Sequence, residues 1–212
     1  MKQKLSLVLV MAALVAFGSQ PARALELGIE GGLAHTSSSV SPATSTFGAG
    51  NTYVFGAFFD YGLATGFGLE VGAFMASRKL TASTTLTVAG VSQTFNGDLT
   101  YLTYQFPVLM RFTLLPFVSF GVGGYYAMGA GNVTETVAGV AVPTTASFAD
   151  AGLKTSDYGV EGDIRFRLPL LPLFGFVVDA RYLYGLADTS ATTGVKLNTR
   201  DLQLLAGIEF GF

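Results

Sequence analysis

Apolar residues alternate one for one with polar or small residues along eight separate segments of this 212-residue chain. In one of them, Val160 and Ile164 share one parity, whereas Glu161 and Arg165 share the other. A period of two residues is that of a β-strand, whose successive side chains point to opposite faces of a sheet. The sequence therefore predicts an all-β fold. The expected strands are Leu25–Ala34, Tyr53–Leu63, Gly66–Lys79, Leu99–Phe112, Phe117–Met128, Ser156–Leu168, Phe174–Leu186 and Asp201–Phe212.

The connections between these segments alternate between short and long. The short ones cover 64–65, 113–116 and 169–173, and the long ones cover about 35–52, 80–98, 129–155 and 187–200. Short turns on one side and long loops on the other are typical of an outer-membrane barrel. A soluble β-sandwich also alternates apolar and polar residues, but only a closed barrel leaves no unpaired edge in a bilayer. We expect an eight-stranded antiparallel up-and-down transmembrane β-barrel.

Composition agrees with a protein that lies in lipid. Hydrophobic residues make up 50% of the chain and charged residues only 12%, against about a quarter in average proteins. Aromatic residues mark both ends of the apolar faces, as expected at two membrane interfaces. At the short-turn end they are Tyr61, Phe67, Phe112, Phe120, Phe166, Phe174, Phe210 and Phe212. At the long-loop end they are Tyr53, Phe55, Tyr104, Tyr126, Tyr158, Tyr182 and Tyr184.

The first 24 residues have the pattern of a cleaved signal peptide. Lys2 and Lys4 precede the apolar run Leu5–Phe17, and Ala22 and Ala24 form an A-x-A cleavage site. We expect a signal peptide at 1–24 and the barrel at 25–212. The mature chain would keep nine of the twelve basic residues and all fourteen acidic ones, a net charge of −5, which argues against a nucleic-acid partner. The absence of cysteine excludes disulfides and thiolate metal sites.

Three segments resemble the small eight-stranded outer-membrane barrels, of the OmpA transmembrane-domain, OmpX and PorT-like type. The last strand resembles the signal read by the barrel assembly machinery: Gly207, Phe210 and Phe212 match it, and Leu205 departs from it. Tyr101–Phe112 is similar to the proline-containing strand of PorT-like proteins. Arg181–Leu186 resembles their penultimate strand. The resemblance covers 25–212 and implies an exported, integral outer-membrane protein that needs the assembly machinery as a partner.

One proline lies inside a predicted strand. Pro107 has no N–H to donate and therefore removes one hydrogen bond from the ladder. We expect a β-bulge or a local bend at this position.

The parity opposite to the apolar faces carries most of the charges. These residues are predicted to line the lumen: Glu26, Glu30, Asp60, Glu70, Arg78, Arg111, Glu161, Asp163, Arg165, Arg167, Asp179, Arg181, Asp201 and Glu209. Val54 and Phe58 are apolar exceptions on that parity. The interior of an eight-stranded barrel is only wide enough for side chains, so one hypothesis is an ion-pair plug. The other is a narrow, cation-preferring pore, because acidic residues are in excess.

Three cations, Lys79, Lys154 and Arg200, lie at loop-side strand ends with lipid-facing parity. They are candidates for contacts with lipopolysaccharide phosphates; solvated end charges are the alternative. The loops at 35–52 and 80–97 contain no charged residue. Thr-rich stretches such as Thr81–Thr87 and Thr144–Thr145 are candidates for hairpins that extend above the membrane.

Catalysis has one candidate, the single histidine. His35 precedes Ser37, Ser38 and Ser39 in the first long loop, and a His–Ser–acid set would suit a lipid A-modifying barrel enzyme. A histidine beside a serine-rich loop is more often a loop residue, so we expect no enzyme, no metal and no cofactor. The sequence indicates a monomer in contact with outer-membrane lipid and lipopolysaccharide, with a structural or surface-interaction role.

Overall fold

The computed structural model describes residues 25–41, 46–88, 91–138, 142–171 and 173–211, and the predicted signal peptide and Phe212 lie outside these ranges. Eight long antiparallel strands form a closed ring in the order β4-β3-β2-β1-β9-β8-β7-β5, and the β4–β5 pairing closes it. The strands of the ring are β1 (Leu25–Ser41), β2 (Thr46–Ala64), β3 (Phe67–Val88), β4 (Val91–Leu115), β5 (Val118–Val137), β7 (Ser156–Leu171), β8 (Phe174–Gly185) and β9 (Lys196–Gly211). The predicted eight-stranded barrel is confirmed.

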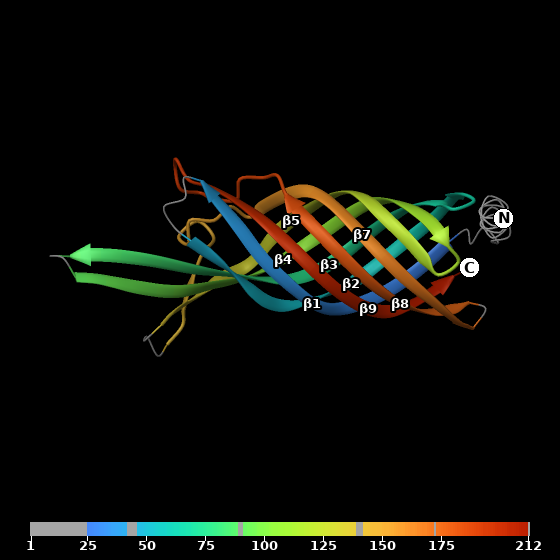
Figure 1. Cartoon of the computed structure of the whole chain (residues 1–212), viewed down its shortest axis with the longest axis horizontal. Coiled ribbons are helices and arrows are strands. Elements are labelled where there is room, and N and C mark those ends of the chain that lie inside the picture. The colour runs from blue at the N-terminus through green and yellow to red at the C-terminus, as the bar shows by residue number, and fades with distance from the viewer. Residues whose placement is uncertain (1–24, 42–45, 89–90, 139–141, 172, 212) are drawn as a thin grey trace, which may run out of the picture.

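Most strands extend further on the long-loop side than the sequence predicts. The stretch 80–98, expected as a loop, continues β3 and β4 as a ladder that ends at the pair Val88–Val91. Figure 1 shows this hairpin projecting well beyond the end of the barrel, while β1 begins and β9 ends at the opposite end. A short ninth strand, β6 (Thr144–Ala146), pairs with β5 outside the ring. The predicted extended hairpin at Thr81–Thr87 is confirmed.

The two faces of the strands differ in exposure as the alternation predicts. On β7, Val160 is 48% and Ile164 is 40% exposed, whereas Glu161 is 3% and Asp163 is 5% exposed. The Tyr residues of the loop-side girdle are also exposed on the outer face, for example Tyr158 at 56%. Because the apolar side chains are the exposed ones, the outer face is suited to lipid and the charged face is the interior.

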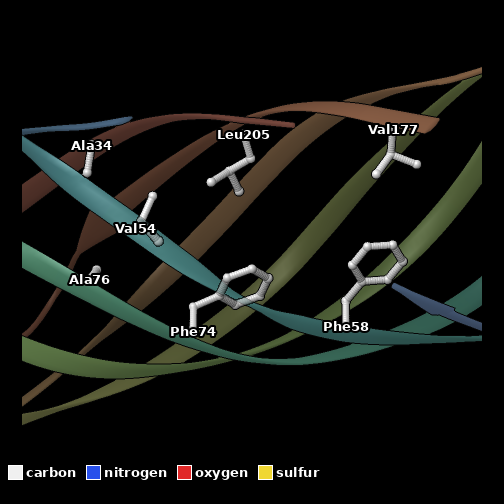
Figure 2. Close-up of a cluster of buried hydrophobic side chains, with 7 residues drawn as sticks. All are labelled: Ala34, Val54, Phe58, Phe74, Ala76, Val177 and Leu205. Carbon is white, nitrogen blue, oxygen red and sulfur yellow. The ribbon is translucent and has the colours of Figure 1, made fainter. Parts of the chain in front are cut away.

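The interior also holds an apolar cluster, of which only Val54 and Phe58 were noted in the sequence as exceptions on the lumen parity. Its members are Ala34, Val54, Phe58, Phe74, Ala76, Val177 and Leu205. Figure 2 shows these side chains on the inner side of the ribbons, with the rings of Phe58 and Phe74 inside the barrel. Glycine makes the space: a Cβ on Gly56 would lie 2.5 Å from Cδ1 of Phe74, and one on Gly28 would overlap the Phe58 ring. Val54 and Phe58, the exceptions to the alternation, are therefore lumen-filling residues.

A β-bulge or a local bend was predicted at Pro107, and the prediction of the bulge is wrong. The pairs Val71–Val108 and Phe74–Gln105 keep one register across the proline, and β5 pairs with it continuously. The space for the proline ring comes from Gly72, where a Cβ would lie 2.9 Å from Cγ of Pro107. Because the neighbouring strand has no side chain at that point, the ring fits without an extra residue.

The apolar stretch 112–130 forms the end of β4, a turn and most of β5. Within the described ranges, no helix is long and apolar enough to span a membrane.

Replacing Val160 by Arg tests the assignment of the outer face. A charge near the middle of the bilayer costs about 2–4 kcal/mol in barrels, so we expect urea unfolding in lipid vesicles to show a loss of this size. Val142→Arg is the control, because Val142 is 70% exposed and lies outside the strands. If both variants were as stable as the parent protein, β7 could not face lipid with Val160.

Candidate functional site

The lumen collects most of the charges of the chain. Ten carboxyl groups are buried there together with four Arg side chains, and a fifth, Arg167, is partly buried. All the residues predicted to line the lumen point inward: Glu26, Glu30, Asp60, Glu70, Arg78, Arg111, Glu161, Asp163, Arg165, Arg167, Asp179, Arg181, Asp201 and Glu209. The strand alternation places them there, and the closed ring brings them together.

Arg165 of β7 lies at the centre of the network. Its guanidinium contacts Glu70 at 2.8 Å, Asp179 at 2.8 Å and Glu30 at 3.4 Å, and all four side chains are fully buried. The ring of Phe58 lies 3.8 Å from the guanidinium carbon. The flat cation is therefore held by carboxylates at its edge and an aromatic ring on its face.

Arg181 of β8 joins the same group from the next strand. It contacts Glu30 at 2.5 Å, Asp179 at 3.0 Å and Glu161 at 3.5 Å. Phe74 lies 4.3 Å from its guanidinium carbon. Two guanidiniums thus share carboxylates, and each is covered by a ring from the apolar cluster.

A second group lies nearer the short-turn end. Arg111 of β4 contacts Asp163 at 2.7 Å, Asp60 at 3.4 Å and also Glu70. It donates to the Ser119 hydroxyl at 3.3 Å as well. This end of the lumen is therefore crossed by contacts between β2, β3, β4, β5 and β7.

Arg167 completes that end of the lumen. It pairs with Glu26 of β1 and, at 2.5 Å, with Glu209 of β9. Its side chain is 20% exposed, because it lies near the barrel opening.

A third group lies toward the long-loop end, around Arg78. This guanidinium contacts Asp157 at 2.7 Å and Asp201 at 2.8 Å. Asp157 also accepts hydrogen bonds from the hydroxyls of Thr199 and Tyr125, at 2.8 and 3.3 Å. Asp157 shares the parity of Glu161 and Asp163, but it is not among the residues predicted to line the lumen.

Two amides extend this group. Gln203 donates to Gln105 at 2.9 Å, and Gln105 lies 3.4 Å from Asp201. Neither amide is among the residues predicted to line the lumen, because an uncharged amide is a weak signal for an ion-pair network.

An apolar cap covers the lumen above Arg78. It consists of Leu80, Tyr101, Val133, Phe148, Leu153 and Leu197. Phe148, from the segment between β6 and β7, meets Tyr101 edge to face with ring centroids 5.6 Å apart. Leu153 forms a β-bridge with Ser190, which joins two of the long connections. No periodic pattern marks this cap, so it could not be predicted from the alternation.

Two of the three rim cations have carboxylate partners. Lys79 pairs with Asp98 at 2.8 Å, and Lys154 with Asp188 at 3.4 Å. Hydrogen bonds from Lys79 and Thr81 lower the pKa of Asp98. The pKa of Asp188 is lowered, most of all by the hydrogen bond from the Leu197 amide.

Arg200, the third rim cation, lies on β9 with its guanidinium carbon 5.0 Å from the centroid of the Tyr184 ring. Of the predicted assembly signal, Gly207 and Phe210 lie in β9, and Phe212 is outside the described residues.

His35 is exposed, and its Nδ1 lies 2.6 Å from Oδ1 of Asn51. The partner at that nitrogen is an amide and not the carboxylate of a catalytic triad. Within the described part of the chain, no three or more His, Cys, Asp or Glu residues are grouped to hold a metal ion.

Removing Arg165 tests how far the barrel depends on the network. Arg165→Ala leaves Glu70, Asp179 and Glu30 buried without one of their shared cations, and breaking a buried pair in this way costs about 3–5 kcal/mol. Urea unfolding in vesicles is expected to show that loss. Arg167→Ala, at the partly exposed end, is expected to lose less. Equal, small losses for the two variants would mean that water screens the whole lumen.

The fold is shared with a known outer-membrane protein, and two others are similar to the chain. OprG from Pseudomonas aeruginosa is 17% identical, with 89% of this chain and 96% of that one covered and a TM-score of 0.51. Neisserial surface protein A is 13% identical (91% and 100% covered, TM-score 0.46). Ail from Yersinia pestis is 16% identical (87% and 98% covered, TM-score 0.43). No curated protein sequence matches the chain.

A family model described as an outer membrane protein beta-barrel domain matches residues 16–191. The match covers most of the chain, and it agrees with the closed ring, the lipid-facing apolar band and the polar interior. The chain therefore belongs to the outer membrane protein beta-barrel domain family, as its resemblance to the small barrels implies, and it is an integral protein of the cell outer membrane.

Proposed function

We propose that this barrel is a membrane anchor that presents the β3–β4 hairpin as an interaction surface outside the cell. The observation that carries the proposal is the length of the hairpin beyond the ring. The pairing of β2 with β3 ends at Thr46–Ser83, and that of β4 with β5 ends at Gly97–Val137. The ladder between β3 and β4 continues to Val88–Val91.

The projecting hairpin has features of a strand-pairing surface. Within the described ranges, 84–88 and 91–95 pair only with each other, so each strand keeps one edge without a ladder partner. Residues 80–97 contain no charge, and charges are a common device that blocks pairing at an edge strand. An extended segment of a partner protein suits such an edge, because the main chain supplies the hydrogen bonds.

The filling of the lumen supports an anchor in preference to a pore. The ion pairs of Arg111, Arg165 and Arg78 cross the lumen between strands that are two or three places apart in the ring. The apolar cap around Phe148 covers the outer end. A narrow cation-preferring pore is the second candidate, favoured by the excess of carboxyl groups over guanidiniums in the lumen.

We also propose that the chain is not an enzyme. The contact between His35 and an amide supports this view. Mass spectrometry of lipid A from cells with and without the chain tests the alternative, a lipid A-modifying enzyme. We expect identical lipid A; a modified form that disappears in His35→Ala would contradict the proposal.

Shortening the hairpin tests the surface role. The variant joins Ser83 to Asn96 through an Asn-Gly turn, which removes 84–95 and suits a two-residue hairpin connection. We expect normal insertion and heat-modifiable migration, because the shortened ladder still ends in a pair. Attachment of cells carrying the variant to a panel of immobilised extracellular proteins is expected to fall to the level of cells without the chain. A variant lacking β6, Thr144–Ala146, is the control. Unchanged attachment of the shortened variant would contradict the proposal.

Conductance separates the anchor from the pore. In planar bilayers we expect no stepwise current from the folded protein at neutral pH. Single-channel steps with cation preference, enlarged by Phe148→Ala in the cap, would favour the pore.

A further inference from the structure

One rim cation lacks the carboxylate that the other two have. Lys79 and Lys154 are neutralised by Asp98 and Asp188. In the described part of the chain Arg200 has no carboxylate within ion-pair distance, and its Nε atom is shielded from solvent without a hydrogen-bond partner. The side chain as a whole is partly exposed, so an anion from outside the chain would neutralise this unpaired guanidinium.

The neighbouring strands hold the guanidinium in place and add polar groups. Arg200 lies directly opposite Tyr184 of β8 and Ser37 of β1, and it stacks on the Tyr184 ring. His35 is on the same face, one diagonal step away, because it pairs with Leu202. Diagonal neighbours on one face are within reach of long side chains.

The histidine is oriented by its own contact. Nδ1 of His35 donates to Oδ1 of Asn51 at 2.6 Å in the tautomer that an amide oxygen requires. This fixes the plane of the imidazole and leaves Nε2 as its second polar atom. When protonated, Nε2 is a donor for an anion beside Arg200.

The height of this patch in the membrane identifies its ligand. Tyr182 and Tyr184 belong to the exposed aromatic girdle on the long-loop side, and such girdles lie at the level of the lipid head groups. At that level the anion available to an outward-facing arginine is a head-group phosphate. Arginine binds phosphate through two parallel N–H donors.

We propose that Arg200, stacked on Tyr184 and assisted by His35 and Ser37, binds a phosphate group of an outer-leaflet lipid. The proposal does not depend on the β3–β4 hairpin, which lies on other strands. It assigns one side of the barrel, at β8, β9 and β1, as the place where a phosphorylated lipid is held.

The test compares Arg200→Gln with Lys196→Gln in the full barrel, refolded in detergent. Lys196 is an exposed cation at the start of the same strand, so both variants lose one positive charge. Heat-modifiable migration checks that each variant is folded. Binding is measured as the rise in unfolding temperature on titration with bisphosphorylated lipid A, with the same lipid after phosphatase treatment, and with inorganic phosphate.

We expect bisphosphorylated lipid A to stabilise the parent protein and Lys196→Gln equally. Arg200→Gln is expected to bind at least tenfold more weakly, and His35→Ala to show a smaller loss. The phosphatase-treated lipid should have little effect. Equal binding by Arg200→Gln and the parent protein would overturn the proposal, as would an equal loss in Lys196→Gln. Stabilisation by inorganic phosphate at the same concentrations would also overturn it, because the site would then be for a free anion.

The hairpin-shortened protein separates this proposal from the surface role. It should keep the full response to bisphosphorylated lipid A, since Ser37, Tyr184 and Arg200 are unchanged. If that response were lost with the hairpin, the ligand would not be held by Arg200.

Discussion

The backbone hydrogen bonds of a strand in hydrocarbon have no water to satisfy them, and the rest of this structure depends on that constraint. The ring answers it through two closures: β1 pairs with β9, and β4 with β5. Once the ring is closed, each strand has one face toward lipid and one toward a narrow interior. The parity of a residue then determines whether its side chain faces lipid or the interior. For this reason a chain with so few charges can bury most of its acidic residues.

The interior must be filled, and here guanidiniums take the place that aliphatic side chains have in a soluble core. Arg165 and Arg181 each contact carboxylates at the edge of the guanidinium and an aromatic ring on its face. Phe58 and Phe74 in turn occupy space that Gly28 and Gly56 leave open. Charged and apolar filling therefore support each other, because the rings that pack against the glycines also cover the cations. Removal of one cation leaves several carboxylates with fewer partners, so the network acts as a unit.

Much of this was predictable because a period of two is a strong signal. The alternation placed Glu30, Arg165 and Asp179 on the face toward the lumen and Val160 on the face toward lipid. It could not assign contacts, since partners such as Arg78 and Asp201 are 123 residues apart and meet only through ring closure. The prediction of a bulge at Pro107 failed because the alternation does not reveal that Gly72 lies beside the proline ring. Apart from the hairpin at Thr81–Thr87, the strand ends above the membrane were not predicted, because Thr and Ser pair well in a ladder and yet have the composition of a loop.

Above the head groups the constraint is relaxed, since water satisfies the backbone of a strand that has only one neighbour. This explains why β3 and β4 can continue as a two-stranded hairpin after β2 and β5 have ended their pairing with them. An edge without a partner is stable there and impossible a few residues below, in the hydrocarbon. We propose that the same boundary applies to Arg200, which has lipid-facing parity and stacks on Tyr184 of the aromatic girdle. The segments free to interact with other molecules are therefore those just beyond the part of the barrel that the bilayer determines, and the barrel fixes their height and direction.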